Sequence, residues 1–292
     1  RTGHGAVWGS KKLKAVSVRG THGVTVADPE TLMQLSFQIS ETSQGPYTAK
    51  YRILGTSTNV LNMNKLGLLP TRNYQEGVFE GAELVSGEYL DAHYKVKKIA
   101  CAQCPIACEQ MSVAPDGPYK GAMTGVEYEC LFANGPNLGI DDLRAVIKLI
   151  EICDQGGMDA MSGGVTVSWA METFERGIFT KEDFKCAKYP EGFEPHFGNA
   201  EAAVTLMEMI RDREGIGDLL SKGTRRASQI VDAERGTETY KWAMNSKGLE
   251  SPGYDARGLK TFSVGVAVGT RGGCHNRSAA YDPDIQGEVD RF

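Results

Sequence analysis

The chain has 292 residues, of which 41% are hydrophobic and 24% are charged, a balance typical of a globular protein with one large domain or two. A formal net charge of −5 and the lack of a Lys/Arg-rich block argue against a surface that binds nucleic acid or anionic membranes. No run of about 18 apolar residues predicts a transmembrane helix, and no signal-peptide pattern is present. The first residue is not Met, and we expect the sequence to be an internal segment of a longer chain.

The first predicted elements are a strand and a helix. Residues 1–26 are expected to form a loop followed by a strand, because the second half of KKLKAVSVRG, residues 11–20, alternates apolar and polar side chains. Residues 26–43 predict a helix, since Asp28 suits the cap and Pro29 suits the first turn. The apolar side of this helix consists of Leu32, Leu35, Phe37 and Ile39.

The rest of the chain is predicted to be mostly helical. Short helices and loops containing Gly and Pro are expected between residues 43 and 90. The strongest helix signal is IDDLRAVIKLIEICDQGG, with Asp141 as the expected cap and Gly156 as the expected stop. Further helices are expected at residues 162–176, 199–211 and 217–232. Irregular Gly-rich loops follow, most clearly after residue 248, so the predicted fold class is mainly α.

Seven cysteines are present, and an odd number with one tight cluster indicates a reducing, cytoplasmic setting rather than a disulfide framework. Cys101, Cys104 and Cys108 form a C-x2-C-x3-C run, and a helical turn after Pro105 would bring the third thiol beside the second. Three local thiolates with one distant cysteine are a standard way to hold an iron–sulfur cluster. Zinc, which usually takes two separated pairs, and a chance group of buried free thiols are the weaker alternatives.

Other candidate residues are individually weak signals. Glu127 and Glu129 in GVEYEC would ordinarily be solvated acids, although a partly buried Glu near a reactive centre can act as a general acid or base. Asp154 and Asp159 bracket two glycines, an arrangement that is more often a helix end than a ligand site. His275 lies in GTRGGCHN, and a His in a Gly-rich loop is often a plain surface residue. The opening RTGHGAVWGSKK does not match a P-loop.

Taken together, these segments resemble the tungsten-containing aldehyde ferredoxin oxidoreductase family over essentially the whole chain. The resemblance runs through GAVWGSKKLKAV, LGLLPTRN, CAQCPIAC, EYE, GIDDL, CDQGGMD, REGIGDLLSKGTRRA, KGLESPGYDARGLK and RGGCH, in the family's order. It implies an N-terminal β-rich pterin-binding domain that ends within residues 1–26. Residues 27–292 would then be a helical region that binds the cofactor and the cluster, comprising two helical domains, the second incomplete.

The resemblance also implies a set of cofactors. These are tungsten or molybdenum held by two molybdopterins, a Mg²⁺ ion that bridges the pterin phosphates, and a [4Fe–4S] cluster. Cys101, Cys104 and Cys108 match the three clustered ligands of that cluster. The fourth ligand of the family lies in a downstream motif, which we expect beyond Phe292.

Site residues are implied position by position. Glu129 matches the active-site glutamate, with Glu127 as the alternative, and His275 matches the active-site histidine near the metal. Met158 stands where the family's first pterin motif usually has Leu, a change that conserves volume. The residues that match pterin-side segments are Gly3, Gly5, Ala6, Asp154, Gly157, Met158, Asp159, Tyr254, Asp255 and Arg257.

The implied reaction is oxidation of a small aldehyde to a carboxylic acid, with electrons passing through the cluster to ferredoxin. A homodimer is left open. Two other readings remain: a tungsten-dependent catalytic subunit of the benzoyl-CoA reductase type, which shares the fold, and a helical fragment that binds no cofactor. The sequence does not select the aldehyde, or tungsten over molybdenum.

Overall fold

The computed structural model describes residues 3–277 and 281–286, and it is mainly α-helical, as the sequence predicts. The α-helices are α1 (His4–Ser10), α2 (Pro29–Ser43), α3 (Ala49–Leu54), α4 (Asn59–Lys65), α5 (Gly87–His93), α6 (Tyr128–Asn134), α7 (Leu143–Gly156), α8 (Ala160–Glu175), α9 (Ala200–Asp212), α10 (Ile216–Leu220), α11 (Thr224–Arg235), α12 (Lys260–Val268) and α13 (Tyr281–Gln286). The strands are β1 (Lys95–Ile99), β2 (Glu109–Val113), β3 (Met123–Val126), β4 (Asn245–Ser246) and β5 (Leu249–Glu250). The 3₁₀ helices are η1 (Pro46–Thr48), η2 (Thr56–Thr58), η3 (Ala82–Val85), η4 (Pro136–Leu138), η5 (Lys181–Phe184), η6 (Thr239–Trp242) and η7 (His275–Arg277).

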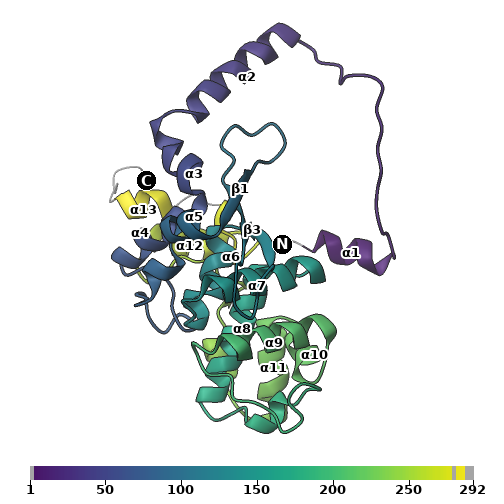
Figure 1. Cartoon of the computed structure of the whole chain (residues 1–292), viewed down its shortest axis with the longest axis vertical. Helices are drawn as coiled ribbons and strands as arrows, with labels where there is room; N and C mark the ends of the chain where they lie inside the picture. The colour runs from purple at the N-terminus through teal and green to yellow at the C-terminus, as the bar shows by residue number, and fades with distance from the viewer. Residues whose placement is uncertain (1–2, 278–280, 287–292) are drawn as a thin grey trace.

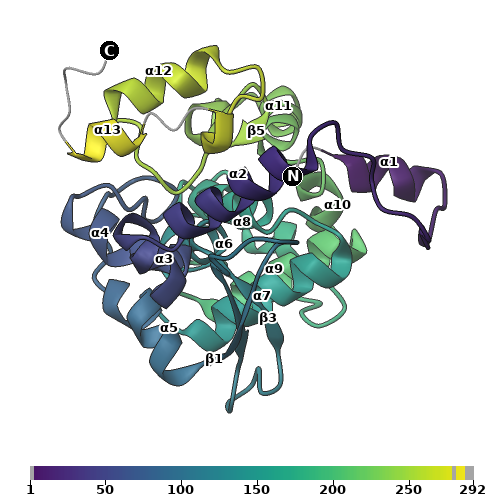
Figure 2. The same cartoon turned by 90° about the horizontal axis from the view of Figure 1, so that it is seen from above.

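The N-terminal segment forms an arm that lies away from the body (Figure 1, Figure 2). The strand predicted within residues 11–20 is wrong: the described residues up to 26 hold α1 and then an irregular segment. A strand needs a hydrogen-bonded neighbour, and here Val18 is 87% exposed with no strand beside it. The assignment of residues 1–26 to the end of a β-rich domain stays a prediction.

Helix α2 begins as predicted. The Asp28 side chain accepts a hydrogen bond from the Thr31 N–H at 3.0 Å, and Pro29 occupies the first turn. Its predicted apolar side does not face the body, since Leu35 and Phe37 are both exposed.

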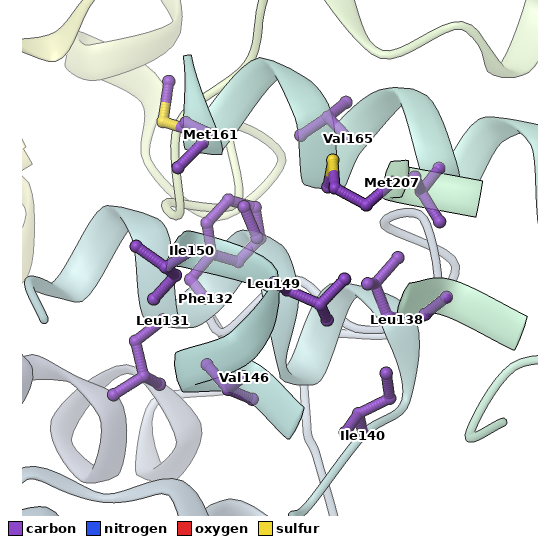
Figure 3. Packing of buried hydrophobic residues seen from close by; sticks show 14 of the residues in the cluster. Leu131, Phe132, Leu138, Ile140, Val146, Leu149, Ile150, Met161, Val165 and Met207 are labelled. Carbon is purple, nitrogen blue, oxygen red and sulfur yellow. The ribbon is translucent and has the colours of Figure 1, made fainter. Parts of the chain in front are cut away.

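The body is built around α8, against which α6, α7, α9 and α11 pack. Leu149 of α7 lies in this core with Val165 of α8 and Met207 of α9 (Figure 3). Trp169 of α8 is fully buried in the same core. In Figure 1, α9 to α11 form one end of the body, and α3 to α5 lie at the other end with α12 and α13.

Three helix boundaries differ from those predicted: the start of α7, the end of α7 and a break at Gly223. The cap of α7 is Asp142 and not Asp141, because it is the Asp142 carboxylate that accepts the Arg144 N–H. Gly156 is the last residue of the helix, and the C-cap that stops it is Gly157, whose φ of 64° suits glycine. The single helix predicted at 217–232 is wrong: it is split into α10 and α11 at Gly223, where φ is 81°.

Two small antiparallel sheets complete the fold. One has the order β1-β2-β3 and packs through β2 and β3 against α7, with Met111 paired to Gly125. The other is the β4–β5 hairpin, in which Asn245 pairs with Glu250. No helix in the described part of the chain is long and apolar enough to cross a membrane.

The packing of the core can be tested by a substitution at Leu149. Leu149→Ala removes a fully buried side chain from the packing of α7, and we expect the free energy of unfolding to fall by about 2–5 kcal/mol in urea titrations. Gln155→Ala is the matched control, because Gln155 lies on the same helix and is exposed; its effect should stay within about 0.5 kcal/mol. Equal effects of the two variants would contradict this account of the core.

Candidate active site

The two predicted catalytic residues lie in contact. Glu129 lies in the first turn of α6, and His275 begins η7. The His275 Nδ1 atom is 3.2 Å from Glu129 Oε1, an ion pair when the imidazole is protonated. Both side chains are largely buried, at 20% and 16% exposure. The second carboxylate oxygen of Glu129 accepts the Gly253 N–H at 2.8 Å.

Glycines bring His275 to this position. A Cβ atom on Gly272 would lie 2.0 Å from the Ser246 carbonyl oxygen, and one on Gly273 would lie 2.5 Å from the Glu250 carbonyl oxygen. Such separations are far shorter than van der Waals contact, so the loop before His275 can lie on the β4–β5 hairpin only without side chains at these positions. The two glycines of the RGGC sequence therefore let the loop place the His275 imidazole against Glu129.

Tyrosines surround the pair. Tyr254 packs against Tyr128 and against His275, with ring centroids 5.3 and 5.7 Å apart, and stacks on Tyr281 at 4.7 Å. Tyr128 donates a hydrogen bond to the Gly253 carbonyl, and Asn59 donates one to the Tyr254 hydroxyl at 3.3 Å. Burial raises the pKa of both Tyr128 and Tyr254 well above the ordinary value, so these phenols stay protonated.

Glu127 does not make the same contacts. Its pKa is raised by desolvation and by the neighbouring carboxylates of Glu109 and Glu129, whereas His275 lowers it. It precedes α6 as the N-cap residue, without a side-chain hydrogen bond to the helix. Of the two acids that the sequence left open, Glu129 is the one held against His275.

The cysteine run forms the loop between β1 and β2. Cys101 is exposed, Cys104 and Cys108 are partly buried, and all three thiols are free. The expected helical turn after Pro105 is absent: the segment bends instead, and Ala107 has a φ of 52°. Among the described residues, no group of three or more His, Cys, Asp or Glu side chains is placed to hold a metal ion.

The loop still has the chemistry of a cluster ligand set. It carries three free thiols, the type of donor that iron–sulfur clusters require. Its end is fixed to the body, since a Cβ atom on Gly55 would lie 2.2 Å from the Cys108 carbonyl oxygen. None of the seven cysteines forms a disulfide, as the sequence predicts.

The motif at residues 154–159 lies at the junction of α7 and α8. The Asp154 carboxylate accepts a hydrogen bond from Thr124 Oγ1 of β3 at 2.5 Å. Asp159 caps α8 and accepts from the Met161 N–H and from Ser162 Oγ. Met158 and Asp159 line a cavity of about 320 Å³, while Gly157 is the exposed C-cap of α7. Both acids therefore hold local structure, and Asp159 does so at the edge of this cavity.

The remaining pterin-side residues lie elsewhere. Asp255 binds the Arg257 guanidinium through both oxygens, and with Tyr254 they line a separate cavity of about 300 Å³. The residues predicted near the pterin phosphates lie at the N-cap and in the first turn of α1, within the arm that lies away from the body (Figure 1). These residues are Gly3, Gly5 and Ala6, all exposed. The structure thus brings together the two residues predicted to be catalytic but not the three segments predicted to contact the pterin.

Sequence reasoning missed several residues of the site. Gly253 holds Glu129 through its N–H, and Tyr128 holds Gly253 through its hydroxyl. Asn59 and Tyr281 complete the surroundings of Tyr254. The Pro-Gly pair before Tyr254 was the one signal of a fixed turn.

Comparison with known proteins identifies the family. The sequence profile described as aldehyde ferredoxin oxidoreductase, domains 2 and 3, matches residues 35–292. The chain belongs to the aldehyde ferredoxin oxidoreductase family. This family assignment agrees with the resemblance inferred from the sequence motifs.

Relatives in the aldehyde ferredoxin oxidoreductase family extend well beyond the matched region. The chain is 39% identical over 292 residues to the tungsten-containing aldehyde ferredoxin oxidoreductase of Pyrococcus abyssi. It is 37% identical over 294 residues to the enzyme of the same name from Thermococcus kodakarensis. Each match covers 98% of this chain but 46% of the relative, so the chain spans about half the length of these relatives.

A solved structure shows the same fold. The BamBC active-site complex of benzoyl coenzyme A reductase, solved with 1,5-dienoyl-CoA, superposes with a TM-score of 0.69 at 23% identity. The match covers 93% of this chain and 41% of that chain. The mainly helical fold of the aldehyde ferredoxin oxidoreductase family is therefore present here.

Gly253 provides a test of the site geometry. A Cβ atom at this position would lie 2.8 Å from the Phe132 ring and 3.0 Å from Tyr128, so Gly253→Ala should lower the free energy of unfolding by about 1–3 kcal/mol. Gly9→Ala is the control, because Gly9 is helical and has open space around it. Urea denaturation of both variants measures the difference, and an unchanged Gly253→Ala protein would contradict the close packing described.

Proposed function

We propose that the protein oxidises an aldehyde to the corresponding carboxylic acid. The observation that carries this proposal is the buried contact between Glu129 and His275, which places a carboxylate and an imidazole together in one site. Membership of the aldehyde ferredoxin oxidoreductase family supports the same reaction. Overall, an aldehyde and water give a carboxylic acid, two electrons and two protons.

The contacts of each residue support the proposed roles. Glu129 accepts a proton from the water that attacks the aldehyde carbon, as a general base in a water-poor site. His275, held by Glu129, donates a hydrogen bond to the carbonyl oxygen and stabilises the charge that develops there. The Gly253 N–H and the packed Tyr254 ring keep these two side chains in register.

The cofactors belong to the proposal as well. When bound, a tungsten or molybdenum bis-molybdopterin centre supplies a Lewis acid and a two-electron acceptor. The residues proposed to hold it are those of the 154–159 motif, of the Tyr254–Arg257 segment and of α1, with Mg²⁺ at the phosphates. Cys101, Cys104 and Cys108 would bind the [4Fe–4S] cluster that passes electrons to ferredoxin, in a cytoplasmic setting.

Metal analysis tests the cofactor assignment. The whole protein, purified without oxygen, should contain tungsten or molybdenum and about four iron atoms per chain, the number in one [4Fe–4S] cluster. Cys108→Ser should lose most of the iron, whereas Cys186→Ser, on a loop away from the run, should keep it. Zinc alone, or equal iron content in both variants, would contradict the cluster assignment.

Kinetics test the base assignment. In the loaded enzyme, Glu129→Gln should reduce kcat for aldehyde oxidation by about 10²–10⁴-fold while metal content stays unchanged, measured with a viologen dye as acceptor. Glu234→Gln is the control, because Glu234 is exposed on α11. Full turnover by Glu129→Gln together with loss of activity in Glu127→Gln would transfer the role to Glu127. Reduction of benzoyl-CoA without aldehyde oxidation would replace the proposed reaction.

A further inference from the structure

A third cavity, of about 270 Å³, adjoins the Glu129–His275 pair. Helices α3 and α4 form one side of it, and Tyr254 and α13 form the other. Apolar and aromatic groups, among them Tyr51, Met63 and Leu66, make up much of its wall. The volume suits a ligand about as large as one substituted aromatic ring, near the lower limit of small-molecule sites.

The charges at this cavity have one sign. Lys50 and Lys65 both line it, and neither has a carboxylate partner among the residues that the structure describes. Lys50 instead lies over the Tyr51 ring, 4.9 Å from its centroid. Asn59 and Asn62 add carboxamide groups, and the described lining residues include no Asp or Glu. Such a site favours an organic anion, because an ammonium group attracts a carboxylate and apolar walls accept the rest of the ligand.

The cavity is next to the reacting groups. Its lining residues Tyr254 and Tyr281 both pack against His275, with ring centroids 5.7 and 6.1 Å away. The Tyr254 hydroxyl is held by Asn59 of the same cavity. Tyr254 and Tyr281 therefore belong both to the wall of the cationic cavity and to the surroundings of the imidazole.

We propose that this cavity binds the carboxylate end of the substrate, and that the substrate is an aldehyde acid with an apolar or aromatic body. Lys50 and Lys65 hold the carboxylate, the tyrosine rings hold the body, and the aldehyde group reaches His275 and Glu129. This substrate class rests on the proposed aldehyde oxidation. The anion site itself does not, so the two can be tested apart.

Binding of unreactive ligands tests the anion site in the whole protein. We expect p-toluate to bind about tenfold more tightly than its neutral analogue p-toluamide, as two partly exposed ion pairs would provide. The difference should disappear in the Lys50→Gln/Lys65→Gln double variant and persist in Lys120→Gln, which changes an exposed lysine outside the cavity. Isothermal titration calorimetry gives both affinities.

Salt dependence gives a second readout that needs no variant. Binding of p-toluate to the unmodified protein should weaken as salt is raised, whereas binding of p-toluamide should not. Equal affinity for the two ligands, or a preference that survives in the double variant, would overturn the proposed site.

Turnover separates this inference from the proposed function. We expect KM for p-carboxybenzaldehyde to be about tenfold lower than KM for p-carbamoylbenzaldehyde, with the difference lost in the double variant and similar kcat values throughout. Oxidation of both aldehydes with equal KM leaves the proposed function in place and overturns the substrate class. Selective p-toluate binding without any aldehyde oxidation supports the anion site and overturns the proposed function.

Discussion

The contact between His275 and Glu129 depends on the absence of side chains at three positions. Gly272 and Gly273 let one loop lie directly on the β4–β5 hairpin, and Gly253 lets another lie against Phe132 and Tyr128 of α6. Both loops belong to the last part of the chain, whereas α6 lies near its middle. Backbone approach at this distance is possible only for glycine, so the site is assembled by close packing of loops on a helix.

Helix α6 holds the Glu129 side chain in place because its opposite face packs against the core. It packs on α7 and α8, whose side chains form the continuous core of the body (Figure 3). Leu131 and Phe132 of α6 are fully buried in that core, while Glu129 faces the loops. A rigid helix with one buried face suits the general base that is proposed at Glu129, because the packed core fixes the position of its side chain.

The sequence predicts the features of the fold that depend on interactions between residues close together in the chain. Helix α2 with its Asp28 cap, and α7 to α9, follow from periodicity and capping, which act within a few residues. The split between α10 and α11 is tertiary: a Cβ atom on Gly223 would press on Glu250, whose carboxylate receives the Thr224 N–H. The valines of residues 11–20 alternate like a strand, but alternation supplies no partner edge. For the site, the resemblance placed Glu129 and His275, whereas the tyrosines around them depend on contacts that no local pattern encodes.

The two acids of the EYE segment receive different surroundings although two residues separate them. Glu129 is contacted at one oxygen by the imidazole and at the other by a backbone N–H, and both contacts stabilise a carboxylate. Desolvation and the neighbouring carboxylates of Glu109 and Glu129 raise the pKa of Glu127. His275 lowers this pKa, but its effect is the smaller one. Burial beside two other acids therefore favours the protonated form of Glu127. Glu129, held at both oxygens, is the carboxylate to which the proposed reaction assigns the proton from water.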